Sequence, residues 1–274
     1  MKIYKTMTIA GSDASGGAGL QADLKTFQER GVYGMCAITT IVAMDPDNEW
    51  FHHVFPQPVD VLEAQIKTIV KGIGVDAMKT GMLGTVEMID LAAETIEKYG
   101  LQNVVIDPVM VCKGADEVLF PEVNAHLRDV LVPKATVVTP NLTEAAQLSG
   151  LGTIRTLEQM KEAAVKIHEL GAKYVLVKGG GKLEYEKAVD VLYDGKTFDI
   201  YESEKVDTTH THGAGCTYSA AITAELAKGK PVKEAVRIAK EFITAAIRHS
   251  FPLNRFFGPT NHAAYRQAES KSMV

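Results

Sequence analysis

A polar, glycine-rich stretch that passes into a helix is the part of this sequence best suited to chemistry. It runs Asp207-Thr-Thr-His-Thr-His-Gly-Ala-Gly-Cys216-Thr-Tyr-Ser-Ala220. Gly213 and Gly215 allow the backbone to approach a ligand closely, because glycine has no side chain. The free N–H groups at the start of the helix would favour an anion, above all a phosphate. An ordinary glycine turn before a helix is the alternative interpretation.

Cys216 falls in the first turn of that helix. The positive end of a helix dipole stabilises a thiolate, so we expect the pKa of this thiol to fall below the usual value of about 8.5. The alternative is a small buried cysteine with a packing role.

A second group of side chains is rich in oxygen. Asp107 ends one strand-like run, and Asn141 stands one helical turn before Glu144 after another. Mg²⁺ prefers hard oxygen ligands and usually bridges one or two carboxylates to phosphates. The alternative is that Asn141 and Glu144 only cap the helix that begins after Pro140.

Lys178 ends a third apolar run and precedes Gly179, Gly180 and Gly181. A lysine at the end of a strand beside a flexible glycine loop suits a nucleotide phosphate. A solvated lysine at a surface turn would show the same local pattern.

Alternating strand-like and helical segments must position these residues. Between them, segment 45–58 is polar and irregular, and 189–193 with 197–201 form a hairpin around Asp194-Gly195. We predict strands at 7–10, 34–43, 77–83, 103–107, 135–140 and 174–181, and helices at 20–29, 59–70, 85–99, 156–170 and 233–248. A further helix follows the Gly213 loop and stops at Gly229.

This alternation predicts a three-layer, doubly wound α/β fold with a mainly parallel sheet. No linker or repeat divides the chain, so we expect one domain over residues 1–274. Ligands of such sheets lie beyond the carboxyl ends of the strands. Asp107, Asn141, Lys178 and the Gly213 loop all follow strands, and we therefore expect them to meet at that edge.

Composition excludes several classes of function. The chain has 274 residues, 46% hydrophobic and 23% charged, with a net charge of −5, which gives no sign of nucleic-acid or acidic-membrane binding. No apolar run approaches the ~20 residues of a membrane span, and the first residues lack the core of a signal peptide. The three cysteines form no disulfide framework or zinc motif, so we expect a cytoplasmic protein.

Several ordered motifs together resemble the hydroxymethylpyrimidine (phosphate) kinase family of the ribokinase-like superfamily. Met110-Val-Cys-Lys-Gly114 and Val42-Ala-Met-Asp45 resemble its bacterial pyridoxine/pyridoxal kinase branch more closely. The motifs are Gly11-Ser-Asp-Ala-Ser-Gly-Gly-Ala-Gly-Leu-Gln-Ala-Asp-Leu-Lys-Thr-Phe27, Lys79-Thr-Gly-Met-Leu83, Val105-Ile-Asp-Pro-Val-Met110, Thr139-Pro-Asn-Leu-Thr-Glu144 and Thr211-His-Gly-Ala-Gly-Cys-Thr217.

The resemblance implies transfer of a phosphoryl group from ATP, with Mg²⁺, to the primary hydroxyl of pyridoxal, pyridoxine or pyridoxamine. Phosphorylation of hydroxymethylpyrimidine is the alternative, possible as a second activity. A non-catalytic nucleotide or vitamer sensor is a different class, and the full set of polar groups argues against it. The family pattern also implies a homodimer.

The resemblance also assigns roles to individual residues of this chain. Gly213, Ala214, Gly215 and Cys216 would form an anion hole, with Cys216 as the base, and Glu144 and Asp107 would hold Mg²⁺. The ATP site would comprise Asn141, Lys178, Gly179, Gly180, Gly181, Lys182, Asp190, Gly215 and Lys240. The substrate ring would be surrounded by Gly11, Asp23, Met44, Met82, Val109 and Cys112.

Two of these residues carry hypotheses on specificity. Pyrimidine kinases of the family have glutamine where Met44 stands, and methionine packs on a pyridine ring but cannot pair with a pyrimidine amine. Cys112-Lys113-Gly114 resembles an active-site flap whose thiol would add reversibly to the aldehyde of pyridoxal. The alternatives are a core methionine and an ordinary glycine turn.

Overall fold

Nine strands form a single sheet in the computed structural model, which describes residues 2–110 and 121–271. The predicted flap residues Cys112, Lys113 and Gly114 lie outside the described residues. The strands are β1 Lys5–Asp13, β2 Tyr33–Asp45, β3 Phe51–Pro56, β4 Ala77–Thr80, β5 Val104–Ile106, β6 Val137–Val138, β7 Tyr174–Gly180, β8 Ala188–Tyr193 and β9 Phe198–Ser203.

The sheet order is β3-β2-β1-β4-β5-β6-β7-β8-β9. From β2 to β7 the neighbouring strands are parallel, whereas β3 at one edge and β8 and β9 at the other pair antiparallel. The strand β3 lies inside the segment that we predicted to be irregular, so that prediction was wrong. The hairpin β8–β9 and the parallel centre are confirmed.

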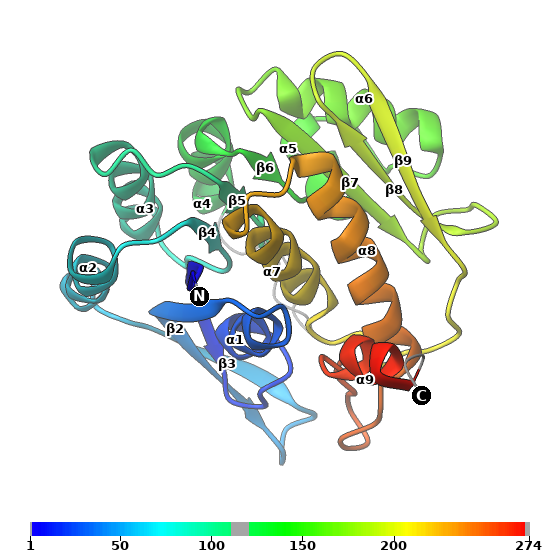
Figure 1. Cartoon of the computed structure of the whole chain (residues 1–274), viewed down its shortest axis with the longest axis horizontal. Helices are drawn as coiled ribbons and strands as arrows, with labels where there is room; N and C mark the ends of the chain where they lie inside the picture. The colour runs from blue at the N-terminus through cyan, green and yellow to red at the C-terminus, as the bar shows by residue number, and fades with distance from the viewer. Residues whose placement is uncertain (1, 111–120, 272–274) are drawn as a thin grey trace.

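Helices cover both faces of the sheet (Figure 1). Their bounds are α1 Gly19–Glu29, α2 Val59–Lys67, α3 Val86–Lys98, α4 Pro121–His126, α5 Leu142–Ser149, α6 Leu157–His168, α7 Ala214–Ala227, α8 Val232–Arg248 and α9 Ala264–Lys271. Short π-helical or 3₁₀ turns span Thr68–Ile73, Leu127–Leu131 and Val132–Lys134.

The helix α7 lies at the centre of the helical layer on its side of the sheet. Residues Thr217–Ala227 are all buried, because α7 packs between α1 and α8 and against β4 and β5. A helix that is apolar on every side is stable only when it is enclosed in this way. Its amino end therefore points from the core of the protein to the carboxyl edge of the sheet.

The predicted start of the helix at 85–99 agrees with the observed cap. Thr85 caps α3, and its Oγ1 accepts a hydrogen bond from Met88 N at 3.3 Å. Within the described residues, no helix is both long and apolar enough to span a membrane.

Candidate active site

A cavity of about 230 Å³ lies at the carboxyl edge of the central strands. It brings together most of the residues that the sequence singled out. Those that line it are Gly11, Met44, Met82, Asp107, Val109, Asn141, Glu144, Lys178, Gly213, Ala214, Gly215 and Cys216. Segments far apart in the chain thus converge at one edge, as the parallel topology predicts.

The amino end of α7 forms one wall of the cavity. Gly213 has a left-handed φ of 76° at the N-cap, and no side chain caps this helix. Within the described part of the chain, the N–H groups of Gly215 and Cys216 have no hydrogen-bond acceptor. Free N–H groups at the positive end of a long buried helix can bind an anion. The anion hole itself stays a prediction.

Asn141 and Glu144 form a capping box at the start of α5. Asn141 Oδ1 accepts from Glu144 N at 3.0 Å, and Glu144 Oε2 accepts from Asn141 N at 2.8 Å. The capping interpretation is therefore correct, but it is compatible with a ligand role, because both residues also line the cavity. Glu144 Oε1 accepts no hydrogen bond from the described residues. Burial raises the pKa of Glu144 to about 7, although Lys178 opposes the rise.

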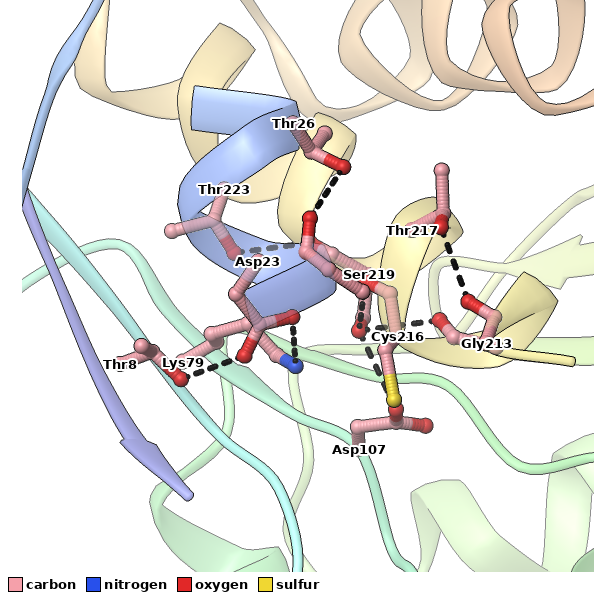
Figure 2. A network of polar contacts seen from close by, with 12 residues as sticks. Thr8, Asp23, Thr26, Lys79, Asp107, Gly213, Cys216, Thr217, Ser219 and Thr223 are labelled. Atoms are coloured by element: carbon pink, nitrogen blue, oxygen red, sulfur yellow. Dashed lines mark hydrogen bonds and ion pairs between the residues drawn. The ribbon is translucent and has the colours of Figure 1, made fainter. Parts of the chain in front are cut away.

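Asp107 lies opposite, after β5. Its Oδ1 accepts from Lys178 Nζ and Thr139 Oγ1, both at 3.2 Å. Its Oδ2 accepts from Ser219 Oγ at 3.1 Å (Figure 2). Burial alone would raise the pKa of Asp107, but Lys178 and Lys79 hold it below its usual value. This carboxylate is therefore charged at neutral pH and fixed in direction.

The carboxylate oxygens of the cavity suit a hard cation that is also coordinated by a bound ligand. Glu144 and Asp107 supply carboxylate oxygens, and one oxygen of buried Glu144 is left for a further partner. No group of three or more His, Cys, Asp or Glu side chains among the described residues could hold a metal by itself. Mg²⁺ commonly binds through only one or two carboxylates, water and substrate phosphates, so this incomplete set fits it.

Cys216 lies at the cavity wall in the first turn of α7. Its thiol differs from our expectation, because burial raises its pKa to about 12, with Lys79 opposing the rise. The thiolate loses more by leaving water than it gains from the helix end. The expectation of a lowered pKa was therefore wrong for the protein without ligands.

Asp23 is the one described substrate residue of our prediction that does not line the cavity. Its side chain is fully buried in α1, where Oδ1 accepts from Lys79 Nζ at 2.8 Å. Lys79 does line the cavity. Asp23 thus lies behind Lys79, which separates it from the cavity.

The remaining nucleotide residues of our prediction lie outside the cavity wall: Gly179, Gly180, Gly181, Lys182, Asp190 and Lys240. Asp190 and Lys240 form a buried ion pair of 2.7 Å between β8 and α8. Asp190 Oδ1 also accepts from Gly180 N at 3.3 Å, so this pair holds the end of the glycine run. Their place in an ATP site stays a prediction.

Sequence reasoning assigned no site role to five polar residues of the cavity: Asp13, His52, Lys79, Thr211 and His212. Lys79 had a usable signal, because a lysine within the otherwise buried strand Ala77–Thr80 needs a charged partner. His52 depends on β3, which the sequence did not predict.

Asp13 and His212 join the loop after β1 to the segment before α7. His212 Nε2 lies 2.7 Å from Asp13 Oδ2, and Asp13 also accepts from the N–H groups of Ser15 and Ala18, both at 2.8 Å. Burial alone would raise the pKa of Asp13, but the hydrogen bonds from His212 and Ser15 lower it to about 2.

The low pKa predicts a pH-dependent contribution to stability. Because the pKa of Asp13 falls from 3.8 to about 2 on folding, its contribution of roughly 2 kcal/mol is present above pH 4 and is lost as the pH falls towards 2. We expect Asp13→Asn to lower the free energy of unfolding by that amount at pH 7 and much less at pH 2. Urea unfolding at both pH values measures this, with the exposed Asp47→Asn as control. An equal loss at both pH values would contradict the ionic role.

Comparisons with known proteins agree with this geometry. Residues 13–261 match the phosphomethylpyrimidine kinase family. The chain is 66% identical over 266 residues to a pyridoxine kinase of Bacillus subtilis, covering 97% of this chain and 98% of that protein. It is 42% identical over 267 residues to the hydroxymethylpyrimidine/phosphomethylpyrimidine kinase of the same organism, with 97% of each chain covered.

Solved structures give the same result. The ADP complex of Bacillus subtilis pyridoxal kinase superposes with a TM-score of 0.94 at 66% identity, over 97% of this chain and 99% of that chain. The Staphylococcus aureus pyridoxal kinase in complex with AMP-PCP and pyridoxal superposes with a TM-score of 0.92 at 50% identity, over 97% and 96%. The predicted ribokinase-like α/β fold is confirmed, and the chain belongs to the phosphomethylpyrimidine kinase family.

Proposed function

We propose that this chain is an ATP-dependent kinase that phosphorylates the primary hydroxyl of pyridoxal, and also of pyridoxine and pyridoxamine. The observation that carries the proposal is the meeting of Lys178, Asp107 and Glu144 with the free N–H groups of α7 in one cavity. Positive charge, cation ligands and an anion hole are the groups that phosphoryl transfer needs. The relatives that bind pyridoxal, ADP or AMP-PCP support the choice of substrates.

Each part of the cavity has a role in this proposal. Lys178 supplies positive charge to the phosphates, and the N–H groups of Gly215 and Cys216 stabilise the charge on the transferred phosphoryl oxygens. The Cys216 side chain accepts the proton of the substrate hydroxyl. Asp107 and Glu144, supported by Asn141, would hold Mg²⁺, which neutralises phosphate charge when bound.

An ATP-consumption assay with each substrate tests the proposal. We expect turnover with pyridoxal, pyridoxine and pyridoxamine, and none without added Mg²⁺. Turnover with hydroxymethylpyrimidine alone would favour the alternative, which the 42% identical pyrimidine kinase supports. Binding of nucleotide and vitamer without turnover would indicate a sensor. We also propose a homodimer, which light scattering on the purified protein checks.

Met44 is the residue expected to choose between the two rings. It lies on β2 opposite His52 of β3, and both line the cavity. We expect Met44→Gln to raise the kcat/KM for hydroxymethylpyrimidine relative to pyridoxal about tenfold, because the amide can pair with the pyrimidine amine and is left unpaired by the pyridine.

Met44→Leu is the matched control, since it keeps an apolar side chain of similar size. We expect the leucine variant to leave the ratio of the two kcat/KM values unchanged. A glutamine variant with the same ratio as the leucine variant would place ring selection elsewhere.

A further inference from the structure

Lys79 is a fully buried lysine in the middle of the sheet. All four residues of β4 are buried, and the Lys79 and Asp23 side chains that form the ion pair are both completely enclosed. Asp23 Oδ2 in turn accepts from Thr8 Oγ1 at 2.6 Å. The carboxylate is therefore held from β1 on one side and holds the ammonium group on the other (Figure 2).

Lys79 is among the residues that line the cavity and Asp23 is not, so the lysine is the cavity-side partner of the ion pair, although its side chain has no solvent-exposed surface. A lysine ammonium group has three N–H donors, and within the described residues Nζ donates only to Asp23. Two donors of a buried cation thus lack a protein acceptor, which is costly in a folded protein unless a ligand or water supplies one.

The free donors lie close to the anion hole. α7 packs on β4, and Figure 2 shows the Lys79 nitrogen between the Asp23 carboxylate and the side chains of Cys216 and Asp107. Gly81 keeps this part of the cavity open, since a Cβ there would come within 2.9 Å of Ala10 Cβ and 3.9 Å of Lys79 Nζ. A ligand oxygen that enters here and accepts a hydrogen bond from Lys79 would lie at the amino end of α7.

We propose that Lys79 is a catalytic residue of the phosphoryl transfer, in which its free N–H donors bind and stabilise oxygens of the phosphoryl group while Asp23 and Thr8 hold it in place. The inference rests on the proposed function. The substrate hydroxyl oxygen bonds to the γ-phosphorus, and the bond from that phosphorus to the β,γ-bridging oxygen breaks. ADP keeps the electron pair, the thiolate form of Cys216 takes the hydroxyl proton, and Lys79 keeps its own protons.

A purely structural ion pair that fixes α1 against the sheet is the competing explanation. The double variant Asp23→Asn/Lys79→Met separates the two, because replacing a buried ion pair by neutral groups of similar size is often neutral for stability. We expect it to fold with a melting temperature within about 5 °C of the unaltered chain. We expect kcat to fall about 10²-fold with little change in the KM for ATP, since the lost contact acts in the transition state.

The pair Arg30–Glu225 provides a matched control. Like Asp23–Lys79 it ties α1 to a neighbouring element, here α7 instead of β4, with Arg30 Nε 2.8 Å from Glu225 Oε1, but neither residue lines the cavity. We expect Arg30→Met/Glu225→Gln to keep kcat within about twofold of the unaltered chain. A kcat for Asp23→Asn/Lys79→Met within about threefold of the unaltered chain would overturn the proposal.

If the double variant does not fold, Lys79→Ala purified in the presence of ethylammonium gives a second measurement, because the added cation can pair with Asp23 and replace the buried charge that the substitution removes. We expect added ethylammonium, which can pair with Asp23 and donate to a ligand, to raise its kcat at least about tenfold, whereas tetramethylammonium, which has no N–H donor, should not. Recovery of the melting temperature without recovery of kcat would overturn the proposal. The unaltered chain is assayed in parallel, and absence of its vitamer turnover would refute the proposed function instead.

Discussion

Replacing Gly213 by alanine is expected to lower kcat by at least about 10³-fold, because the change displaces two anion-hole donors together. The backbone of Gly213 has φ 76° and lies directly against the loop that follows β1. An alanine Cβ would overlap the carbonyl oxygen of Gly17 and would lie 3.1 Å from Ala18 Cα. These are backbone atoms that no rotamer change can move, so the first turn of α7 must shift.

The two loops fit together through glycine on both sides. A Cβ on Gly17 would lie 2.6 Å from His212 Cδ2, in the segment that leads into α7. The N–H groups of Gly215 and Cys216 keep their direction only while this contact is intact. We therefore expect Gly213→Ala to lower kcat by more than its loss of unfolding free energy would explain.

Gly229 supplies the control at the other end of α7. Its φ of 83° is also left-handed, but a Cβ there would meet nothing within 4 Å. Gly229→Ala should therefore cost about 1 kcal/mol of unfolding free energy from the backbone alone and leave kcat unchanged. Urea unfolding and steady-state kinetics on both variants make the comparison. A Gly213→Ala variant with normal kcat would show that the anion hole is not built on this turn.

The sequence was sufficient to predict the centre of the sheet and the convergence of its polar residues. The central strands are short apolar runs because both faces of the sheet are covered, and Asp107, Asn141 and Lys178 each stand at the carboxyl end of one of them. Residue type and local period suffice for such elements. The caps Thr85 and Asn141 were predictable for the same reason, since a cap depends only on its next few residues.

The strand β3 could not be predicted from local pattern. Phe51 and Phe55 are each 53% exposed, so its apolar residues point away from the core, and Pro56 ends it. The segment is a strand because it pairs with β2 at the sheet edge, where proline is tolerated. Unless β3 is known, no local pattern places His52 in the cavity.

The buried ion pairs were beyond sequence reasoning for a related cause. Lys79 and Asp23 are 56 residues apart, and Lys240 and Asp190 are 50 apart. No local period links such residues, so only the packing of α1 and α8 on the sheet makes them partners. The pKa of Cys216 shows the same limit. The sequence reveals the helix end that would lower this pKa, but it does not reveal the burial that raises it by more.

Cys216→Ala is expected to fold normally and to lower kcat by at least about 10²-fold, the usual contribution of a general base. The substitution removes the thiol but keeps the backbone N–H, so it separates the base from the anion hole. Cys216 is one of the two described free cysteines, and Cys36, half-buried in β2 and outside the cavity wall, provides the control. We expect Cys36→Ala to retain kcat.

The pH dependence distinguishes a base from a packing residue. Because burial raises the pKa of Cys216 to about 12, only a small fraction of the thiol is deprotonated at neutral pH. If the thiolate accepts the hydroxyl proton, kcat must rise as the pH rises from 6 to 9, and Cys216→Ala must lose that rise as well as the rate. A variant with near-normal kcat would exclude the thiol as base and leave the N–H groups of α7, together with Lys178 and Lys79, to carry the transfer by electrostatic stabilisation alone.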